Sequence, residues 1–147
     1  MTFQELCDRN EIAALLVKYA TAVDHDLELW DEVFTADAMI DYSSMGQGAP
    51  RLSHDLKQRL SVAFEGRLGA QHLLSNLRIE VVGDTGRGSC EAYAVRVDPG
   101  GTDATVTLTH QGARYVDEFI RTANGWRIRS RHGAIVWRYY STGPRMA

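Results

Sequence analysis

The stretch Leu77-Arg-Ile-Glu-Val-Val-Gly-Asp-Thr-Gly86 changes the hydrophobic period of the chain and decides its fold. Its apolar residues at 77, 79 and 81 alternate with Arg78 and Glu80, which is the two-residue period of a strand with one buried face. The glycine-flanked end of the stretch predicts a turn into a second strand. Upstream the apolar residues recur mostly at helical spacing, and downstream they follow the period of strands.

Three segments upstream are expected to be helices. Residues 2–23 form the first, and it carries one apolar stripe made of Ile12, Ala13, Leu15, Leu16, Tyr19, Ala20 and Val23. A short second helix is expected over 26–34, with Asp26 as its N-cap. The third is expected to have Ser53 as its N-cap and to stop at Gly66. Residues 38–42 predict a short strand, and 43–50, with two glycines and a proline, predict a loop.

Further strands are expected downstream over 88–97, about 105–121 and 126–137. Turn sequences separate them, namely Asp98-Pro-Gly-Gly101 and Asn124-Gly125. Helices followed by an antiparallel meander predict an α+β fold, in which the helices cover one face of a curved sheet. Because no repeat, linker or low-complexity segment interrupts the chain, residues 1–147 are expected to form one domain.

Composition narrows the class of protein. The chain is 44% hydrophobic and 24% charged, and its formal net charge of −3 offers no basic footprint for nucleic acid. No apolar run is long enough to span a membrane, and the N-terminus lacks the features of a secretion signal, so a cytoplasmic protein is expected. Cys7 and Cys90 lie far apart and match no metal or redox motif, and no His-x-x-x-His pair is present. Neither a metal nor a cofactor is therefore predicted.

Asp24 is the residue of the first helix that most needs explanation. It falls on the flank of the apolar stripe and in the last helical turn, where the helix dipole disfavours a negative charge. A carboxylate in that position is unfavourable unless a donor or a cation meets it. The alternative is that Asp24 caps the turn at residues 25–27.

Three segments together give the chain a family resemblance. The sequences LWDEVFTADAMIDY (29–42), QHLLSNLRIEV (71–81) and RYVDEFIRTANGWRIRSR (114–131) resemble the SnoaL-like branch of the nuclear-transport-factor-2-like superfamily. The resemblance implies a cone, in which a strongly bent antiparallel sheet wraps around the three N-terminal helices and leaves a pocket between them. Scytalone dehydratase, hexachlorocyclohexane dehydrochlorinase and bile-acid 7α-dehydratase belong to this superfamily, and each pairs an Asp at the end of the first helix with a His that enters the sheet.

The same resemblance implies roles for particular residues. His72 would be the general base, Asp24 its orienting partner and Tyr19 a pocket tyrosine. His132, between Trp126 and Trp137, occupies the place of a polar pocket residue. The chain departs from the pattern after the dyad His: where those dehydratases have a second His or Asp, this sequence has Val95-Arg96-Val97.

Side-chain chemistry adds further candidates for substrate binding. Tyr42 and Tyr93 could supply hydroxyl donors to an enolate, and Trp30 is a further candidate. Residues 126, 128, 130 and 132 share one strand parity, which would turn His132 toward the pocket unless it is a rim residue. His72 shares parity with the polar Arg78, so it faces the pocket only if a bulge lies near Ser75-Asn76 or if the strand starts after these residues.

The sequence therefore favours a cofactor-independent lyase or isomerase that acts on a small, largely apolar, cyclic or polyketide-like substrate. A His–Asp pair suits proton abstraction next to a carbonyl, because the carboxylate fixes the imidazole tautomer and stabilises the imidazolium. The alternative is a non-catalytic binding protein or an assembly subunit like the β subunits of ring-hydroxylating oxygenases. A homodimer or homotrimer is expected, because the outer face of the sheet is expected to keep apolar residues such as Tyr93, Val95, Tyr115 and Phe119, and three helices cannot bury both faces of one sheet.

Overall fold

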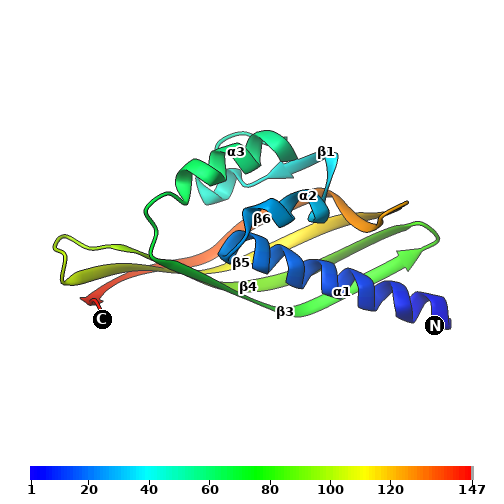
Figure 1. Ribbon diagram of the computed structural model, residues 1–147. Coiled ribbons are helices and arrows are strands. Elements are labelled where there is room, and N and C mark those ends of the chain that lie inside the picture. The colour runs from blue at the N-terminus through cyan, green and yellow to red at the C-terminus, as the bar shows by residue number, and fades with distance from the viewer. Residues whose placement is uncertain (147) are drawn as a thin grey trace.

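The computed structural model describes residues 1–146 and places the helices on one face of a curved sheet (Figure 1). In chain order the elements are α1 (Phe3–Asp24), η1 (Leu27–Leu29), α2 (Trp30–Val33), β1 (Phe34–Asp41), η2 (Ser43–Met45), β2 (Arg51–Leu52), α3 (Ser53–Ala63), β3 (Gly69–Val82), β4 (Thr85–Pro99), β5 (Thr105–Thr122) and β6 (Gly125–Pro144). The expected α+β architecture and the long meander are confirmed.

The sheet has the order β2-β1-β6-β5-β4-β3. Strands β3 to β6 pair antiparallel, because tight turns join each strand to the next. The expectation of an entirely antiparallel sheet is wrong at one pair, since β1 lies parallel to β6. No turn connects these two strands, so nothing local fixes their relative direction.

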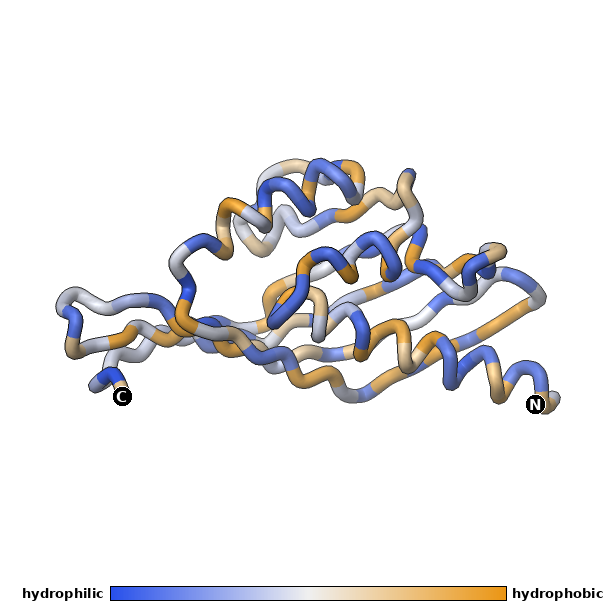
Figure 2. The backbone as a smooth tube through the Cα atoms, viewed as in Figure 1, coloured by the Kyte–Doolittle hydropathy of each residue, from blue (hydrophilic) through white to orange (hydrophobic). Residues whose placement is uncertain are grey.

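Helix α1 begins with a capping box, in which Thr2 and Glu5 exchange side-chain-to-backbone hydrogen bonds. It packs along β3, and apolar segments occur on both elements where they lie together (Figure 2). The core fills the space between the helices and the concave face of the sheet. Its largest fully buried apolar side chains are Trp30, Tyr115, Phe119, Ile12, Leu16, Ile40, Leu56 and Ile128.

The start of α3 differs from the sequence expectation. Ser53 is the first residue of the helix and not its N-cap, a position that Leu52 occupies without a side-chain hydrogen bond. The Ser53 hydroxyl is buried and accepts a hydrogen bond from Trp30 Nε1 at 2.7 Å. A tertiary contact has therefore taken the polar group that was expected to cap the helix.

Bulges decide which side chains face the inside of the cone. Strand β3 starts at Gly69, and its register shifts between Ser75 and Arg78, where Asn76 has φ 53°. The bulge expected near Ser75-Asn76 is thus confirmed, and it lets His72 face inward although Arg78 faces outward. Strand β6 has two further shifts, one beside Arg129 and one beside Val136.

The convex face of the sheet carries exposed apolar side chains. One row crosses four neighbouring strands through Leu73, Tyr93, Gly112 and Trp137. Tyr115 and Phe119, which were expected on this face, instead lie in the core and are 2% and 1% exposed. The alternation of β5 places both residues on the concave side with Ala113.

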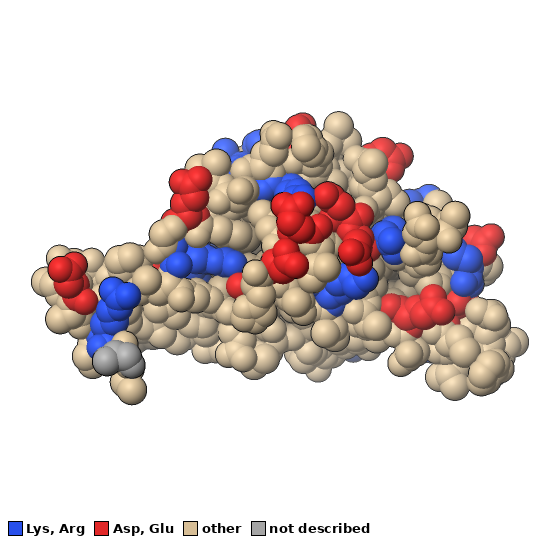
Figure 3. Space-filling view, viewed as in Figure 1, with Lys and Arg blue, Asp and Glu red and all other residues tan. Residues whose placement is uncertain are grey.

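The surface in Figure 3 mixes charges of both signs. Asp and Glu side chains gather near the middle of this face, with Lys and Arg around them. Among the ion pairs of the surface, Lys57 pairs with Asp31 and Lys18 with Glu32. Within residues 1–146, no helix is both long enough and apolar enough to cross a lipid bilayer.

Candidate active site

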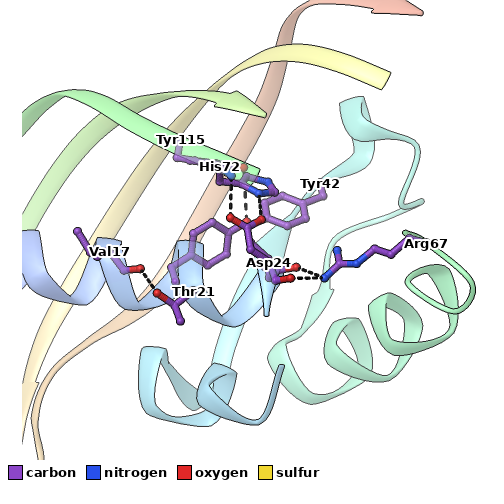
Figure 4. Close-up of polar contacts among 9 residues, drawn as sticks. Val17, Thr21, Asp24, Tyr42, Arg67, His72 and Tyr115 are labelled. Atoms are coloured by element: carbon purple, nitrogen blue, oxygen red, sulfur yellow. Dashed lines mark hydrogen bonds and ion pairs between the residues drawn. The ribbon is translucent and has the colours of Figure 1, made fainter. Parts of the chain in front are cut away.

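Asp24 and His72 meet at the junction of α1 and β3. Asp24 Oδ1 lies 2.6 Å from the ring nitrogen Nδ1 of His72, and Asp24 Oδ2 accepts a hydrogen bond from the His72 backbone N–H at 2.7 Å. The two side chains are 6% and 15% exposed. Figure 4 shows Asp24 between His72 on one side and Arg67 on the other. The carboxylate thus fixes both the ring and the backbone of His72.

Burial and hydrogen bonding act in opposite directions on Asp24. Burial raises the pKa of the Asp24 carboxyl group. The ring and backbone hydrogen bonds from His72 together lower this pKa by more than burial raises it, so the net pKa lies below the ordinary value. Arg67 Nη2 donates to the backbone carbonyls of Val23 at 2.5 Å and Asp24 at 3.1 Å. Those donors satisfy the carboxyl end of α1, where a cation is favourable. Asp24 therefore stays ionised beside His72 at neutral pH.

A cavity of about 270 Å³ opens beside His72. Its helix side is apolar and includes Val23, Leu60 and Phe64, so the pocket is closed by α1 and α3. Because Nδ1 of His72 is bound to Asp24, Nε2 is the ring nitrogen left to act on a molecule in this cavity. The volume suits a small ligand of about one or two rings.

Three tyrosine hydroxyls gather at the inner end of the cavity. Tyr19 Oη lies 2.8 Å from Tyr42 Oη and 3.4 Å from Tyr115 Oη, and all three residues line the cavity. The Tyr19 ring also stands edge-on to the His72 ring, with 6.4 Å between centroids. Burial raises the pKa of each tyrosine, so the hydroxyls keep their protons and can donate hydrogen bonds.

A buried ion pair lies behind these tyrosines. Arg131 Nε and Nη2 donate to the two carboxylate oxygens of Asp117 at 2.6 and 2.7 Å, and both side chains are almost completely buried. The guanidinium carbon lies 4.2 Å from the Tyr19 ring centroid and 4.3 Å from that of Tyr115. Arg131 Nη1 also donates to Tyr42 Oη at 3.5 Å. The positive charge of Arg131 thus polarises the tyrosine cluster.

Some expected site residues lie in this cavity and others do not. His72, Tyr19 and Tyr42 line it, and Asp24 supports His72 from behind. His132 does not line it. The bulge beside Arg129 reverses the parity of β6, so that Arg131 points inward and His132 lies half exposed, 3.1 Å from Asp41 Oδ2. The parity that placed His132 in the pocket is therefore wrong.

Two aromatic candidates also fall outside the cavity. Tyr93 lies on the convex face, where its hydroxyl is 2.9 Å from His110 Nδ1, because its neighbour Ala94 takes the inward position. Trp30 is fully buried in the core, with its ring centroid 4.4 Å from that of Phe34. Neither side chain therefore lines the cavity, contrary to the positions expected for substrate binding.

Several charged residues in and behind the cavity carried no simple signal in the sequence. Arg131 and Asp117 look like ordinary members of charged, alternating strands, and only their register within bulged β5 and β6 turns them inward. The cations that line the cavity itself are Arg67, Arg96 and Arg138. Arg96 lies in the Val95-Arg96-Val97 segment, where the sequence departs from the dehydratase pattern, and its side chain lines the cavity.

The described side chains offer no other evident reactive centre in the cavity. No group of three or more His, Cys, Asp or Glu residues within 1–146 is placed to hold a metal ion. Cys90 is buried, and burial raises the pKa of its thiol to about 11, which keeps it protonated and unreactive. His72 is therefore the side chain in the cavity best suited to exchange a proton near neutral pH.

Residues 4–132 match the family model of the SnoaL-like domain. The chain is also 35% identical over 129 residues to the Uncharacterized protein Rv2910c of Mycobacterium tuberculosis. That alignment spans 87% of this chain and 85% of the relative.

Solved structures share the fold over nearly the whole chain. The Kfla4162 protein from Kribbella flavida superposes with a TM-score of 0.79 and 24% identity, covering 90% of this chain and 93% of that one. A hexachlorocyclohexane dehydrochlorinase, LinA Type2, superposes with a TM-score of 0.74 and 20% identity, covering 97% and 94%. At these identities the likeness concerns the fold.

Proposed function

The chain belongs to the SnoaL-like domain family, and we propose that it is a cofactor-independent lyase or isomerase whose base is His72. The observation that carries the proposal is the Asp24–His72 pair beside a cavity with an apolar helix side. The likeness to a dehydrochlorinase, an enzyme named for an elimination, supports the same class of chemistry. The substrate would be small, largely apolar and cyclic.

In the proposed reaction, His72 Nε2 takes a proton from a carbon next to a carbonyl group. The electrons of the broken C–H bond move to the carbonyl oxygen and form an enolate. Asp24 keeps Nδ1 protonated, so Nε2 carries the free electron pair, and it stabilises the imidazolium that results. Asp24 is thus a positioning residue, because it acts through His72.

The tyrosine cluster would stabilise the enolate. Tyr19, Tyr42 and Tyr115 hold protonated hydroxyls at the inner end of the cavity, and the adjacent Arg131 makes them better hydrogen-bond donors. Donors that are fixed in place before the reaction stabilise a developing oxyanion without reorganisation. The sheet and the Asp117 ion pair keep this cluster rigid.

Two outcomes are open to the enolate. If its β carbon carries a leaving group, the electrons return, form a C=C bond and expel that group with its bonding pair. If no leaving group is present but a C=C bond is conjugated with the enolate, His72 returns the proton to the γ carbon, the double bond moves into conjugation with the carbonyl, and an isomer results. Arg96 occupies the place of the missing second acid, and a guanidinium stays charged, so it can stabilise a departing anion but does not supply a proton.

Proton exchange tests this proposal without knowledge of the natural substrate. A panel of cyclic and aryl-fused ketones is incubated in D₂O, and loss of the α-proton signal is followed by ¹H NMR. We expect the wild-type chain to accelerate exchange for at least one ketone and His72→Ala to reduce it to the buffer rate. His54→Ala changes an exposed histidine on α3 and should exchange at the wild-type rate.

Equal exchange by the wild type and His72→Ala would overturn the assignment of the base. If no ketone exchanges faster than in buffer, the proposal of carbon-acid chemistry fails. The non-catalytic binding protein or assembly subunit would then be the better interpretation, because the convex sheet face exposes Leu73, Tyr93 and Trp137.

A further inference from the structure

The concave face of the sheet presents two polar rows to the cavity. In one, the strand register aligns His72, Ala94, Gln111 and Arg138 across β3 to β6. In the next, it aligns Ala70, Arg96, Thr109 and Tyr140. In the first row the small Ala94 lies between His72 and the polar residues of β5 and β6, which leaves room for a ligand to reach from one side to the other.

The charges on this lining are unequal. Arg67, Arg96 and Arg138 line the cavity, whereas none of its lining side chains in the described chain is Asp or Glu. Arg96 Nε is held by both oxygens of Asp98, at 2.8 and 2.9 Å. Asp24 supplies a second negative charge, but its side chain is engaged by His72. Two cations of the lining, Arg67 and Arg138, are therefore left without a carboxylate among the described side chains.

Of these two cations, Arg138 is the one that lies in the same row as His72. Its one side-chain hydrogen bond within residues 1–146 is from Nη2 to the neutral Gln111 Oε1, at 3.1 Å. Arg67 adds to the positive field, since it binds neutral backbone carbonyls and lies 3.9 Å from the Phe64 ring centroid. A guanidinium without a carboxylate, beside a polar amide and in a partly enclosed cavity, is suited to bind an oxyanion.

The opposite side of the cavity is apolar, through Val23, Leu60 and Phe64. We propose that the ligand of this site is an amphiphilic acid: an apolar ring system against α1 and α3, and an oxyanionic head group bound by Arg138 and Arg67. This proposal rests on the proposed function, because it names the class of substrate on which His72 would act at the same site. The shared chemistry of the head group is that of a carboxylate or a phosphate ester.

Binding of matched aromatic probes tests the proposal. The three probes are 2-naphthoate, the neutral 2-naphthamide and 2-naphthyl phosphate, each titrated into the wild-type chain by isothermal calorimetry at pH 7 and fixed ionic strength. We expect at least one of the two acids to bind about tenfold or more tightly than the amide, the effect of one charge-assisted hydrogen bond. The acid that binds more tightly identifies the head group.

Charge-removing variants then locate the contact. Arg138→Gln should weaken binding of the preferred acid about tenfold and leave the amide unchanged, because only the acid gains from the guanidinium. Arg129→Gln is the matched control, since Arg129 is on the same strand but pairs with Glu118 outside the cavity. Arg67→Gln should act like Arg138→Gln, and thermal unfolding reports whether loss of its contacts to α1 alters the fold.

Several results would overturn the proposal. These are equal affinity for the acids and the amide, no binding of either acid at millimolar concentration, or equal weakening by Arg138→Gln and Arg129→Gln. The measurement needs no turnover, so its outcome is independent of the proton-exchange assay. If the acids bind but no ketone exchanges its proton, the cavity is an anion-binding pocket and His72 is not a base. If a ketone exchanges but neither acid is preferred over the amide, His72 is a base and the proposed oxyanion contact is wrong.

Discussion

Each carboxylate oxygen of Asp24 is bound to a different part of His72, one to the ring Nδ1 and the other to the backbone N–H. The imidazole therefore cannot rotate away without losing its partner, and the end of α1 is joined to the beginning of β3. This arrangement predicts different consequences for changes at the two residues.

Asp24→Asn should reduce the rate of α-proton exchange by about two to four orders of magnitude while leaving measurable activity. The amide keeps the shape but loses the charge that supports the imidazolium, and it can favour the wrong tautomer. His72→Ala should remove the activity altogether. NMR exchange rates of both variants check this order, and equal loss in both, with wild-type thermal unfolding, would contradict the positioning role of Asp24.

The buried ion pair gives a prediction about stability. Asp117→Asn leaves the charge of Arg131 without its carboxylate in the core, which should lower the free energy of unfolding by about 3–5 kcal/mol. Urea denaturation measures the change. Glu118 is next to Asp117 in the chain and is the exposed partner of Arg129, so Glu118→Gln should alter the free energy of unfolding by less than about 1 kcal/mol. Similar values for the two variants would show that the burial of the Asp117 pair is unimportant.

These two ion pairs also show where sequence reasoning reached its limit. The alternation of apolar and polar residues predicted the strands, and the glycine-containing turns predicted their order. It could not predict that one extra residue beside Arg129 reverses the alternation of β6. That bulge places Arg131, and not His132, inside the cone.

The Asp24–His72 contact was within reach of the sequence for two reasons. A carboxylate on the flank of an apolar stripe requires a partner, and the family resemblance supplied His72. The bulge at Asn76 could also be anticipated, because without it His72 would have faced outward. Arg67, Arg96 and Arg138 could not be grouped, since their approach depends on how α3 and the strands β3 to β6 curve around one cavity.

Acid should destabilise the chain partly through Asp8. Hydrogen bonding from Arg121 at 2.8 Å holds the pKa of Asp8 below its ordinary value of 3.8. Because this pKa is lower in the folded state, the stability that Asp8 contributes is present above about pH 4 and is lost as the pH falls through the folded value. Asp8→Asn should therefore flatten the pH dependence of urea unfolding between about pH 2 and 4, unlike the exposed control Asp37→Asn.

The convex sheet face predicts self-association. Trp137 and Tyr139 are 44% and 61% exposed there, and the Trp137 indole lies over Gly112, where an added Cβ would come within 2.1 Å of Nε1. Exposed aromatic rows of this kind are typical of interfaces. We expect a homodimer or homotrimer by light scattering at micromolar concentration, dissociated by Trp137→Glu. A wild-type monomer would contradict the expectation.

Gly133 should be needed to seat Tyr42 in the cluster. A Cβ added at Gly133 would lie 2.8 Å from two carbons of the Tyr42 ring, which is buried and cannot move freely. Gly133→Ala should therefore reduce α-proton exchange and lower the free energy of unfolding by about 1–3 kcal/mol, the usual effect of overpacking. Gly143→Ala, on the same strand with no atom within 4 Å of its added Cβ, is the control. Wild-type exchange and stability in Gly133→Ala would show that the exact position of Tyr42 does not matter.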